Sequence, residues 1–415
     1  MQFSDFNLHE NILKSLEENN YKETTSIQEN VIGEVMLKKD LLAKAQTGSG
    51  KTASFVLPIL NHFINNPYSG KSKIKTLVLT PTRELTLQVA NTFETFASNF
   101  NKKPKIVSII GGQSIGDQLL DIQKGCDIVV ATTGRLLDII NKKQINLEKI
   151  EFFVLDEADK MLDLGFMEEL DEVLKLLPKE RQNLLFSATY PQKMLDIASK
   201  ITTSAIKIEQ EDETPTVENI KQRAILVNHE NRSPLLRELI KSNDWNQVLV
   251  FMANKRASDN IAAKFRKHGI DAESFHGDLL QEERIETLED FKDKKIKVLF
   301  ATDIAARGLH VDDISCVVNF DLPRATADYI HRIGRTGRAG KDGLAISFVT
   351  LENAEHFKLI EKRCKINLDK EQIEGFELQG QVVKKDKGKE PVKGKRKSKK
   401  DKLREAQALK DKEAK

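Results

Sequence analysis

The feature that most constrains this chain is a glycine-rich loop at residues 45–52, with the sequence Ala-Gln-Thr-Gly-Ser-Gly-Lys-Thr. It follows a short apolar run at residues 41–43 that predicts a strand, and it precedes a helical segment that begins near Ser54. In such a strand–loop–helix unit, backbone N–H groups turn inward on phosphate oxygens, Lys51 reaches the terminal phosphates and Thr52 holds a metal ion. A glycine-rich turn with a solvated lysine is the alternative, but the spacing of the glycines, Lys51 and Thr52 favours a phosphate-binding loop.

Short apolar runs alternate with helical segments along the rest of the chain. The runs occupy residues 76–80, 106–110, 127–131, 152–155 and 183–186, and then 248–251, 298–301, 316–320 and 345–349. They are nearly all apolar, which is typical of parallel strands covered by helices on both faces. The acidic segment 209–216 has no periodicity and predicts a linker. We therefore expect an α/β fold with two doubly wound parallel-sheet domains in tandem.

Composition limits the classes of protein to which this chain can belong. No apolar run approaches the ~18 residues of a membrane span, so no membrane partner is expected. The three cysteines lie far apart and predict neither a disulfide framework nor a zinc cluster. The N-terminal residues do not resemble a secretory leader, so a cytoplasmic location is expected.

The net charge of +3 averages two unlike parts of the chain. Residues 384–415 carry 15 Lys and Arg against 6 Asp and Glu, whereas the preceding residues carry 51 against 57. Basic segments of this kind are usually solvated, and they attract nucleic acid without sequence preference. We predict a disordered basic C-terminal tail at residues 376–415.

Two acidic residues follow the apolar run 152–155 directly, at the carboxyl end of a predicted strand, where ligands of open α/β sheets collect. Phosphoryl transfer to water needs one carboxylate near a metal ion and another group that orients the water. Asp156 and Glu157 can divide these roles. A solvated helix start with acidic residues in its first turn is the alternative interpretation.

A second charged stretch lies in the half of the chain without a phosphate loop. Residues 331–338 read His-Arg-Ile-Gly-Arg-Thr-Gly-Arg, a sequence expected to be both a poor core and a poor helix. Guanidinium groups bind phosphates bidentately, so Arg335 and Arg338 can act as arginine fingers from across a cleft. An exposed basic loop is the alternative.

Together these residues resemble the DEAD-box ATP-dependent RNA helicases, and particularly their bacterial RhlE-type branch. The likeness spans about residues 3–375, and it implies that both domains are RecA-like. Asp-Glu-Ala-Asp at 156–159 is the box that names the family, and Ser187 and Thr189 match the motif that couples hydrolysis to unwinding. The residues that the resemblance implies for RNA binding are Thr82, Arg83, Gly112, Thr132, Arg135, Gln281, Arg284 and Thr302.

The resemblance also implies ATP and Mg²⁺ as cofactors. The residues implied to bind ATP are Phe3, Tyr21, Gln28, Gly48, Ser49, Gly50, Lys51 and Thr52, and those implied to hold Mg²⁺ are Thr52 and Asp156. Gln28 would recognise the adenine edge and Tyr21 would stack near the base, whereas Phe3 has ordinary packing as its alternative. The implied catalytic residues are Lys51, Asp156, Glu157, His331, Arg335 and Arg338, with Glu157 deprotonating the attacking water.

Four positions depart from the family pattern. Asn20 and Thr24 stand where the family usually has glycine and proline, and Thr133 also replaces a proline. These three changes are expected to affect loop stiffness more than contacts. His310 replaces an aspartate associated with the ATP ribose, so ribose selectivity or ATP affinity would differ here, unless the change is tolerated at an exposed edge.

The predicted organisation has five parts: an adenine-recognition region (1–29), an ATP-binding domain (30–208), a linker (209–216), a C-terminal helicase domain (217–375) and the tail (376–415). The implied function is RNA-stimulated ATP hydrolysis that unwinds short RNA duplexes or remodels RNA–protein complexes through sequence-independent backbone contacts. Ribosomal precursors and RNA-decay machinery are compatible partners. A DNA helicase and a non-unwinding, ATP-gated RNA clamp are the alternatives.

Overall fold

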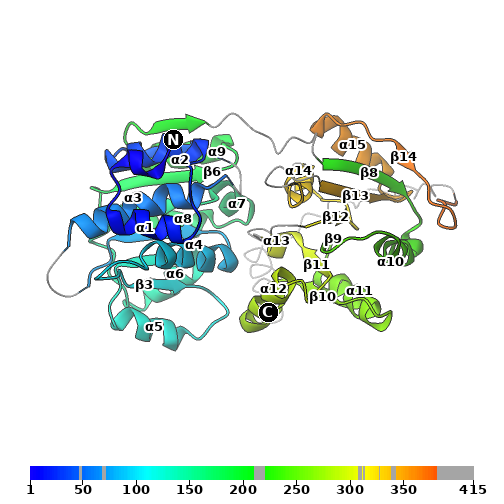
Figure 1. The fold of residues 1–415 in the computed structure, drawn as a ribbon, viewed down its shortest axis with the longest axis horizontal. Coiled ribbons are helices and arrows are strands. Elements are labelled where there is room, and N and C mark those ends of the chain that lie inside the picture. Colours follow the sequence, from blue (N-terminus) through cyan, green and yellow to red (C-terminus); the bar gives the residue numbers. More distant parts are fainter. Residues whose placement is uncertain are drawn as a thin grey trace, which may run out of the picture.

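The computed structural model describes residues 1–45, 49–67, 72–209, 220–306, 311, 314–326, 328–337 and 343–380. Two lobes lie side by side, and each is built around one seven-stranded parallel sheet (Figure 1). This arrangement confirms the predicted tandem of doubly wound α/β domains.

The first sheet has the strand order β3-β4-β2-β5-β6-β1-β7. Its strands are β1 (Leu41–Lys44), β2 (Thr76–Thr80), β3 (Ile106–Ile109), β4 (Ile128–Thr132), β5 (Phe152–Leu155), β6 (Gln182–Ser187) and β7 (Ile206–Glu209). The second sheet has the order β10-β11-β9-β12-β13-β8-β14. Its strands are β8 (Ile220–Leu226), β9 (Val248–Met252), β10 (Ala272–Phe275), β11 (Val298–Thr302), β12 (Cys316–Asn319), β13 (Gly343–Val349) and β14 (Lys370–Glu371).

Helices cover both sheets. The first lobe contains η1 (Phe3–Phe6), α1 (Glu10–Glu18), α2 (Ser26–Met36), α3 (Lys51–Asn65), α4 (Arg83–Phe96), α5 (Ile115–Gln123), α6 (Thr133–Asn141), α7 (Ala158–Asp163), α8 (Met167–Leu174) and α9 (Gln192–Ile201). The second contains η3 (His229–Asn231), α10 (Arg232–Ser242), α11 (Lys255–Lys267), α12 (Gln281–Lys292), α13 (Asp303–Ala306), α14 (Asp328–Ile333) and α15 (Ala354–Cys364). In the described parts of the chain, no helix has the length and apolar character needed to cross a membrane.

The cores explain why the central strands are almost continuously apolar. Successive side chains of a strand point to opposite faces of the sheet. In β6, Leu184 and Phe186 belong to a core cluster with side chains of α2, α3 and α4, whereas Leu185 belongs to the cluster with α6, α8 and α9. Both faces are therefore buried, and polar residues are excluded from each position of the strand centre.

Strands β7, β8, β10 and β14 were not among the predicted strands. The first three mix charged and apolar residues, and β14 consists of one lysine and one glutamate. Three of them are edge strands and β8 lies next to an edge, where one side stays accessible to solvent. The predicted linker starts one residue too early, since Glu209 pairs with Lys44 as the last residue of β7. The remaining linker positions, 210–216, lie outside the described residues.

The predicted disordered tail also starts too early. Phe376 packs against the core of the second lobe, and the backbone N–H and carbonyl of Gln379 both bond the Asn228 side chain, at 2.7 and 2.8 Å. Residues 376–380 are thus part of the folded second lobe, and the prediction is wrong for them because it followed charge composition alone. Residues 381–415, which carry the basic charge, lie outside the described residues.

Two truncations test this boundary. Ending the chain after Gly380 keeps Phe376 and Gln379 in place, so the thermal unfolding midpoint should not change. Ending it after Gly375 exposes apolar surface that Phe376 covers, at a cost of about 1–2 kcal/mol. We expect the midpoint of that variant, measured by calorimetry, to fall by about 2–8 °C. Equal midpoints for both truncations would contradict the packing described above.

Candidate active site

Three predicted site residues of the first lobe lie at the carboxyl ends of neighbouring strands of its sheet. Strands β5, β6 and β1 are neighbours in the order of the sheet, and all of them are parallel. Asp156 follows β5, Ser187 ends β6, and Lys51 begins the helix after β1. The carboxyl ends of these strands therefore bring together three segments that are far apart in the sequence, as expected for an open α/β sheet.

The phosphate loop requires glycine where it joins α3. Gly50 has φ +92°, and a Cβ added there would lie 2.5 Å from Nε2 of Gln28. The Gln28 amide donates to the Gly50 carbonyl at 3.2 Å, and the Thr25 hydroxyl donates to the Ser49 carbonyl at 2.7 Å. Helix α2 thus holds the end of the loop, while Gly48 lies outside the described residues.

Four charged side chains are buried together beside this loop. Lys51, Asp156 and Glu157 are 6%, 2% and 3% exposed. Nζ of Lys51 has no hydrogen-bond partner among the described residues. Lys160, one turn into α7, forms a 2.6 Å ion pair with Glu157, and sequence reasoning missed it because a lysine next to acidic residues is usually an exposed one. Thr52 lies next to Lys51 in the first turn of α3 and is partly exposed.

The two carboxylates of this cluster have opposite pKa shifts. Burial raises the pKa of Asp156 to about 6, the charge on Glu157 adds to the rise, and Lys51 opposes it. Burial also acts to raise the pKa of Glu157, but the charges of Lys160 and Lys51 outweigh it and lower that pKa below its ordinary value. Glu157 is therefore held ionised, as a proton acceptor must be. Its φ of +49° is a left-handed conformation that non-glycine residues rarely adopt.

The predicted coupling residues are bonded to the acidic box. The Ser187 hydroxyl accepts from the Asp159 N–H at 3.2 Å and donates to the Thr189 carbonyl at 2.6 Å. The N–H and the hydroxyl of Thr189 both donate to Oδ2 of Asp159, each at 3.0 Å. A movement of Asp159 would therefore be transmitted to the segment after β6.

The second lobe contributes His331 and Arg335 to the same region. The charge of Arg335, which is 5% exposed, acts on the Glu157 carboxylate and lowers its pKa. The His331 side chain is exposed to solvent, but partial desolvation lowers its pKa below the ordinary value. The charge of Lys160 lowers this pKa further, whereas the charge of Asp159 raises it. The charges of Arg335 and His331 therefore interact electrostatically with residues of the acidic box and with Lys160. Arg338 lies outside the described residues.

One expectation for this stretch is wrong, because residues 328–333 form α14 and Arg332 lies in the core. The Arg332 guanidinium forms two bonds to Asp303, at 2.6 and 2.7 Å, and lies over the Phe251 ring at 4.8 Å. A carboxylate partner and an aromatic face compensate the cost of burying a guanidinium, and neither was visible in the local sequence.

Of the predicted adenine contacts, Gln28 bonds the end of the phosphate loop, at the Gly50 carbonyl. Tyr21 is 43% exposed and packs edge-on against Phe96, so one part of its ring is open for stacking. Phe3 is 3% exposed and belongs to the core cluster, which agrees with the packing alternative. The amide of Gln28 is engaged by Gly50 and by the Thr25 N–H.

The departures from the family pattern have local explanations. Asn20 has φ +60°, which asparagine tolerates better than most residues in place of glycine. The Thr24 hydroxyl bonds the Met1 carbonyl and Glu29, two contacts that a proline would lack. Thr133 is the first residue of α6, a position that also suits proline. His310 lies outside the described residues.

The predicted RNA-binding residues of the first lobe lie where its strands end and its helices begin. Thr82 caps α4 by accepting from the Leu85 N–H, and Arg83 lies against Gly112, where an added Cβ would clash with the guanidinium. Thr132 ends β4, and Arg135 on α6 is bonded to the Gln113 carbonyl at 3.0 Å.

Two predicted RNA-binding residues of the second lobe, Gln281 and Arg284, are buried and contact residues of the first lobe. A third, Thr302, is the last residue of β11, at the carboxyl ends of the strands of the second sheet. Arg284 forms a 2.7 Å ion pair with Glu84, and these side chains are 7% and 8% exposed. The Gln281 carbonyl oxygen accepts from Arg83 at 3.4 Å. Sequence reasoning did not predict that Glu84 pairs with Arg284, because nothing in the chain shows which residue of the other domain will face it.

Comparison with known proteins identifies the family. The DEAD/DEAH box helicase model matches residues 25–197, and the helicase conserved C-terminal domain model matches residues 231–340. The chain belongs to the DEAD/DEAH box helicases. It is 39% identical to the DEAD-box ATP-dependent RNA helicase CshA of Bacillus subtilis, over 89% of this chain and 73% of that protein. It is 38% identical to the ATP-dependent RNA helicase RhlB of Pseudomonas syringae, over 87% and 92%. The narrower likeness to the RhlE-type branch stays a prediction.

The arrangement of the lobes in this DEAD/DEAH box helicase has a solved counterpart. Dbp5 of S. cerevisiae bound to RNA and ADP BeF3 superposes with a TM-score of 0.78 at 31% identity, over 89% of this chain and 95% of that one. A variant of Dbp5 bound to Nup159, Gle1, IP6 and ADP superposes with a TM-score of only 0.61, at 30% identity over 88% and 96%. The two lobes are thus placed more as in the RNA-bound Dbp5 structure.

The raised pKa of Asp156 gives a stability prediction for the helicase without nucleotide or metal. Because the folded-state pKa lies above the unfolded value, the ionised carboxylate destabilises the fold at neutral pH. This cost begins to shrink as the pH falls below about 6 and is lost only below the ordinary pKa of an aspartate. Asp156→Asn should therefore raise the free energy of unfolding at pH 7.5 in EDTA, on the order of 2 kcal/mol. The gain should shrink at pH 5, whereas Asp171→Asn should have little effect at either pH. A destabilised Asp156→Asn variant at pH 7.5 would count against the burial argument.

Proposed function

We propose that the chain is an ATP-dependent RNA helicase, which hydrolyses ATP to ADP and phosphate and locally separates RNA strands. One observation carries the proposal. The buried cluster of Lys51, Asp156 and Glu157 in one lobe is within electrostatic reach of Arg335 in the other. A site divided between two lobes makes hydrolysis depend on their relative position, and RNA that spans both lobes controls that position.

The residues at the end of the phosphate loop fit a nucleotide with its metal ion. The ammonium of Lys51 is buried and has no hydrogen-bond partner among the described residues, so a phosphate oxygen could bind it. The Asp156 carboxylate forms no ion pair within the described part of the chain. A carboxylate and a hydroxyl are oxygen ligands of the kind that Mg²⁺ prefers, so Asp156 and Thr52 would hold it. When bound, Mg²⁺ would neutralise charge on the phosphates.

Hydrolysis then divides among residues of both lobes. Lys51 binds the terminal phosphate, and Glu157 orients a water molecule and accepts its proton as the water oxygen attacks the γ-phosphorus. The bond from the γ-phosphorus to the bridging oxygen breaks, and Arg335 stabilises the charge that develops on the phosphoryl oxygens. Arginine fingers contribute about 10³–10⁵ to the rate in related systems, so separated lobes should hydrolyse ATP slowly. Arg338 is proposed for the same role.

Closure of the lobes is supported by the Arg284–Glu84 ion pair, because both partners are buried at the contact between the lobes. The likeness of the lobe arrangement to RNA-bound Dbp5 supports RNA as the ligand that favours this state. RNA contacts by Thr82, Arg83, Gly112, Thr132, Arg135, Gln281, Arg284 and Thr302 are part of the proposal. So are a cytoplasmic location, and ribosomal precursors or RNA-decay machinery as partners.

Two assays separate this function from its alternatives. The ATPase activity of a DNA helicase would be stimulated by single-stranded DNA at least as strongly as by RNA of the same sequence, whereas that of an RNA helicase responds to RNA. A non-unwinding clamp would hydrolyse ATP with RNA but would not displace a strand from a short duplex. RNA-stimulated hydrolysis together with ATP-dependent strand displacement would support the proposed function, and the absence of stimulation by RNA would contradict it.

Glu157→Gln removes the proton acceptor and keeps the size of the side chain. The variant should bind ATP with unchanged affinity, whereas its RNA-stimulated turnover should fall by about 10²–10⁴-fold. Fluorescent-nucleotide binding and steady-state phosphate release measure the two quantities. The matched control, Glu148→Gln, changes an exposed carboxylate and should keep full turnover. Full turnover by Glu157→Gln would show that another group accepts the proton.

The ion pair between the lobes can be tested by a double-mutant cycle. Glu84→Gln leaves the buried Arg284 without its counter-charge, which costs about 3–5 kcal/mol in buried pairs, so RNA-stimulated turnover should fall by at least tenfold. The double variant Glu84→Gln/Arg284→Gln should lose less than the sum of the two single losses. Additive losses would mean that the two residues act separately, for example through independent contacts with RNA.

A further inference from the structure

Helix α11 carries a row of cations that the proposed ATPase site does not use. Arg256, Lys264 and Lys267 are exposed, and none of them forms an ion pair with another residue that the structure describes. At about 100° per residue, these three positions and Asn260 fall on one side of the helix, within about a quarter of its circumference. We call Arg256, Lys264 and Lys267 the α11 cation row.

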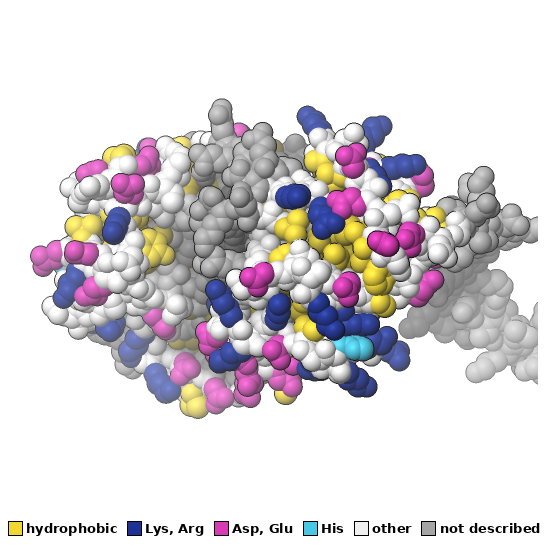
Figure 2. Space-filling model, turned by 45° about the vertical axis from the view of Figure 1, so that its right-hand side comes forward, with side chains coloured by type: hydrophobic (Ala, Val, Ile, Leu, Met, Phe, Trp, Pro, Cys, Tyr) yellow, Lys and Arg dark blue, Asp and Glu magenta, His cyan; other side chains and the backbone are white. Residues whose placement is uncertain are grey.

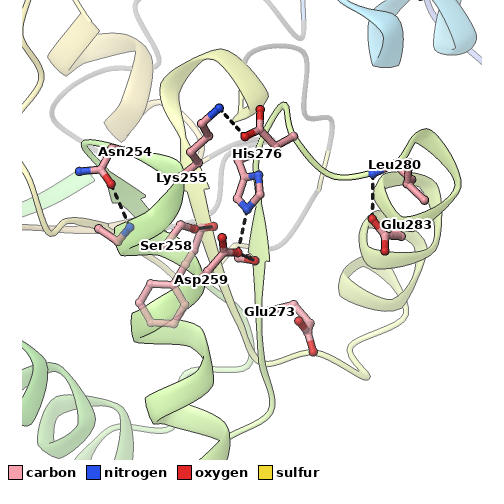
Figure 3. Close-up of polar contacts among 12 residues, drawn as sticks. Asn254, Lys255, Ser258, Asp259, Glu273, His276, Leu280 and Glu283 are labelled. Carbon is pink, nitrogen blue, oxygen red and sulfur yellow. Dashed lines mark hydrogen bonds and ion pairs between the residues drawn. The ribbon is translucent and has the colours of Figure 1, made fainter. Parts of the chain in front are cut away.

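The other charged side chains of α11 are engaged by neighbouring elements, and Figure 3 shows this for Lys255 and Asp259. Lys255 pairs with Asp278, and Arg266 pairs with Glu273 at 2.7 Å. Asp259 accepts from the Ser274 hydroxyl at 2.5 Å and bonds Nε2 of His276 at 2.7 Å. These acidic groups therefore have partners of their own, and the row stays positive. Figure 2 shows Lys and Arg side chains gathered over the lower part of the second lobe, where Figure 1 places α11.

The row starts at the edge of the second sheet that carries proposed RNA contacts. Helix α11 follows β9, whose last residue Met252 pairs with Thr302 at the end of β11. Its first residue, Lys255, pairs with Asp278 in the loop that leads to Gln281 (Figure 3). From this edge the row runs for three turns, about 16 Å, away from the contact between the lobes.

We propose that the α11 cation row binds phosphates of an RNA segment that continues beyond the part held between the lobes. The inference rests on the proposed RNA-binding function. A nucleic-acid backbone presents phosphates at regular intervals, so a row of unpaired cations on a rigid helix can neutralise several of them and release their counterions. Neither a base-specific contact nor an aromatic side chain is involved, so the binding is independent of sequence.

The test compares two RNAs and two variants of the full chain. One RNA is a single strand just long enough to span the two lobes, and the other adds a duplex arm to it. The variant Arg256→Gln/Lys264→Gln/Lys267→Gln removes the row. The control, Lys142→Gln/Lys175→Gln/Lys179→Gln, removes three cations on the surface of the first lobe. Fluorescence anisotropy with a non-hydrolysable ATP analogue gives Kd at several salt concentrations.

We expect the row variant to bind the short RNA like the unmodified chain and to bind the RNA with the arm about tenfold more weakly. For the longer RNA, the slope of log Kd against log salt concentration should be smaller for the row variant than for the unmodified chain, by up to about 2. Each phosphate contact contributes about 0.7–0.9 to this slope. The control variant should match the unmodified chain with both RNAs.

Other outcomes overturn the inference. Equal weakening with both RNAs would assign the row to the segment between the lobes, and unchanged binding of both would remove it from RNA binding. Loss of polyglutamate binding by the row variant, with RNA binding intact, would favour an acidic protein partner. If the unmodified chain binds neither RNA, the proposed function fails first, and this inference fails with it.

Discussion

The burial of four charges at the carboxyl ends of β1 and β5 is the constraint on which the rest of the structure depends. Of these, only Lys160 and Glu157 form a direct ion pair, at 2.6 Å. Lys51 and Asp156 form no ion pair within the described part of the chain, which is costly inside a protein. A sheet packed on both faces supplies the stability that offsets this cost, and the proposed phosphates and cation would recover it on entering the site.

This constraint also explains why a second lobe is needed. The cluster in the first lobe would bind a nucleotide through Lys51, but the proposed mechanism needs a further positive charge to stabilise the phosphoryl oxygens. In the proposed mechanism Arg335 supplies that charge from the second lobe, and the Glu84–Arg284 pair ties the lobes together at another point of their contact. Because both contacts join side chains from different lobes, each is lost when the lobes separate. Control of lobe separation would thereby be control of catalysis.

Much of the fold followed from residue patterns because the central strands are buried on both faces. Runs such as 76–80 and 152–155 admit few interpretations other than interior strands, and both are strands with those bounds. Edge strands carry a weaker signal, since one side of β10 or β14 meets solvent or a loop and tolerates charge. The tail boundary was misplaced for a related reason: Phe376 and Gln379 are held by local contacts that composition does not reveal.

The sequence by itself determined the family and the two α/β domains. It also predicted the residues of the proposed site, because glycine, lysine and carboxylates at fixed spacings after strands have few other uses. Only the tertiary structure decided which charges neutralise one another. Lys160 forms an ion pair with Glu157, and Arg284 forms one with Glu84 of the other lobe. Arg332 is buried in the core and pairs with Asp303. The physical reason is that an ion pair forms between atoms a few ångströms apart in space, whereas the sequence specifies only their separation along the chain.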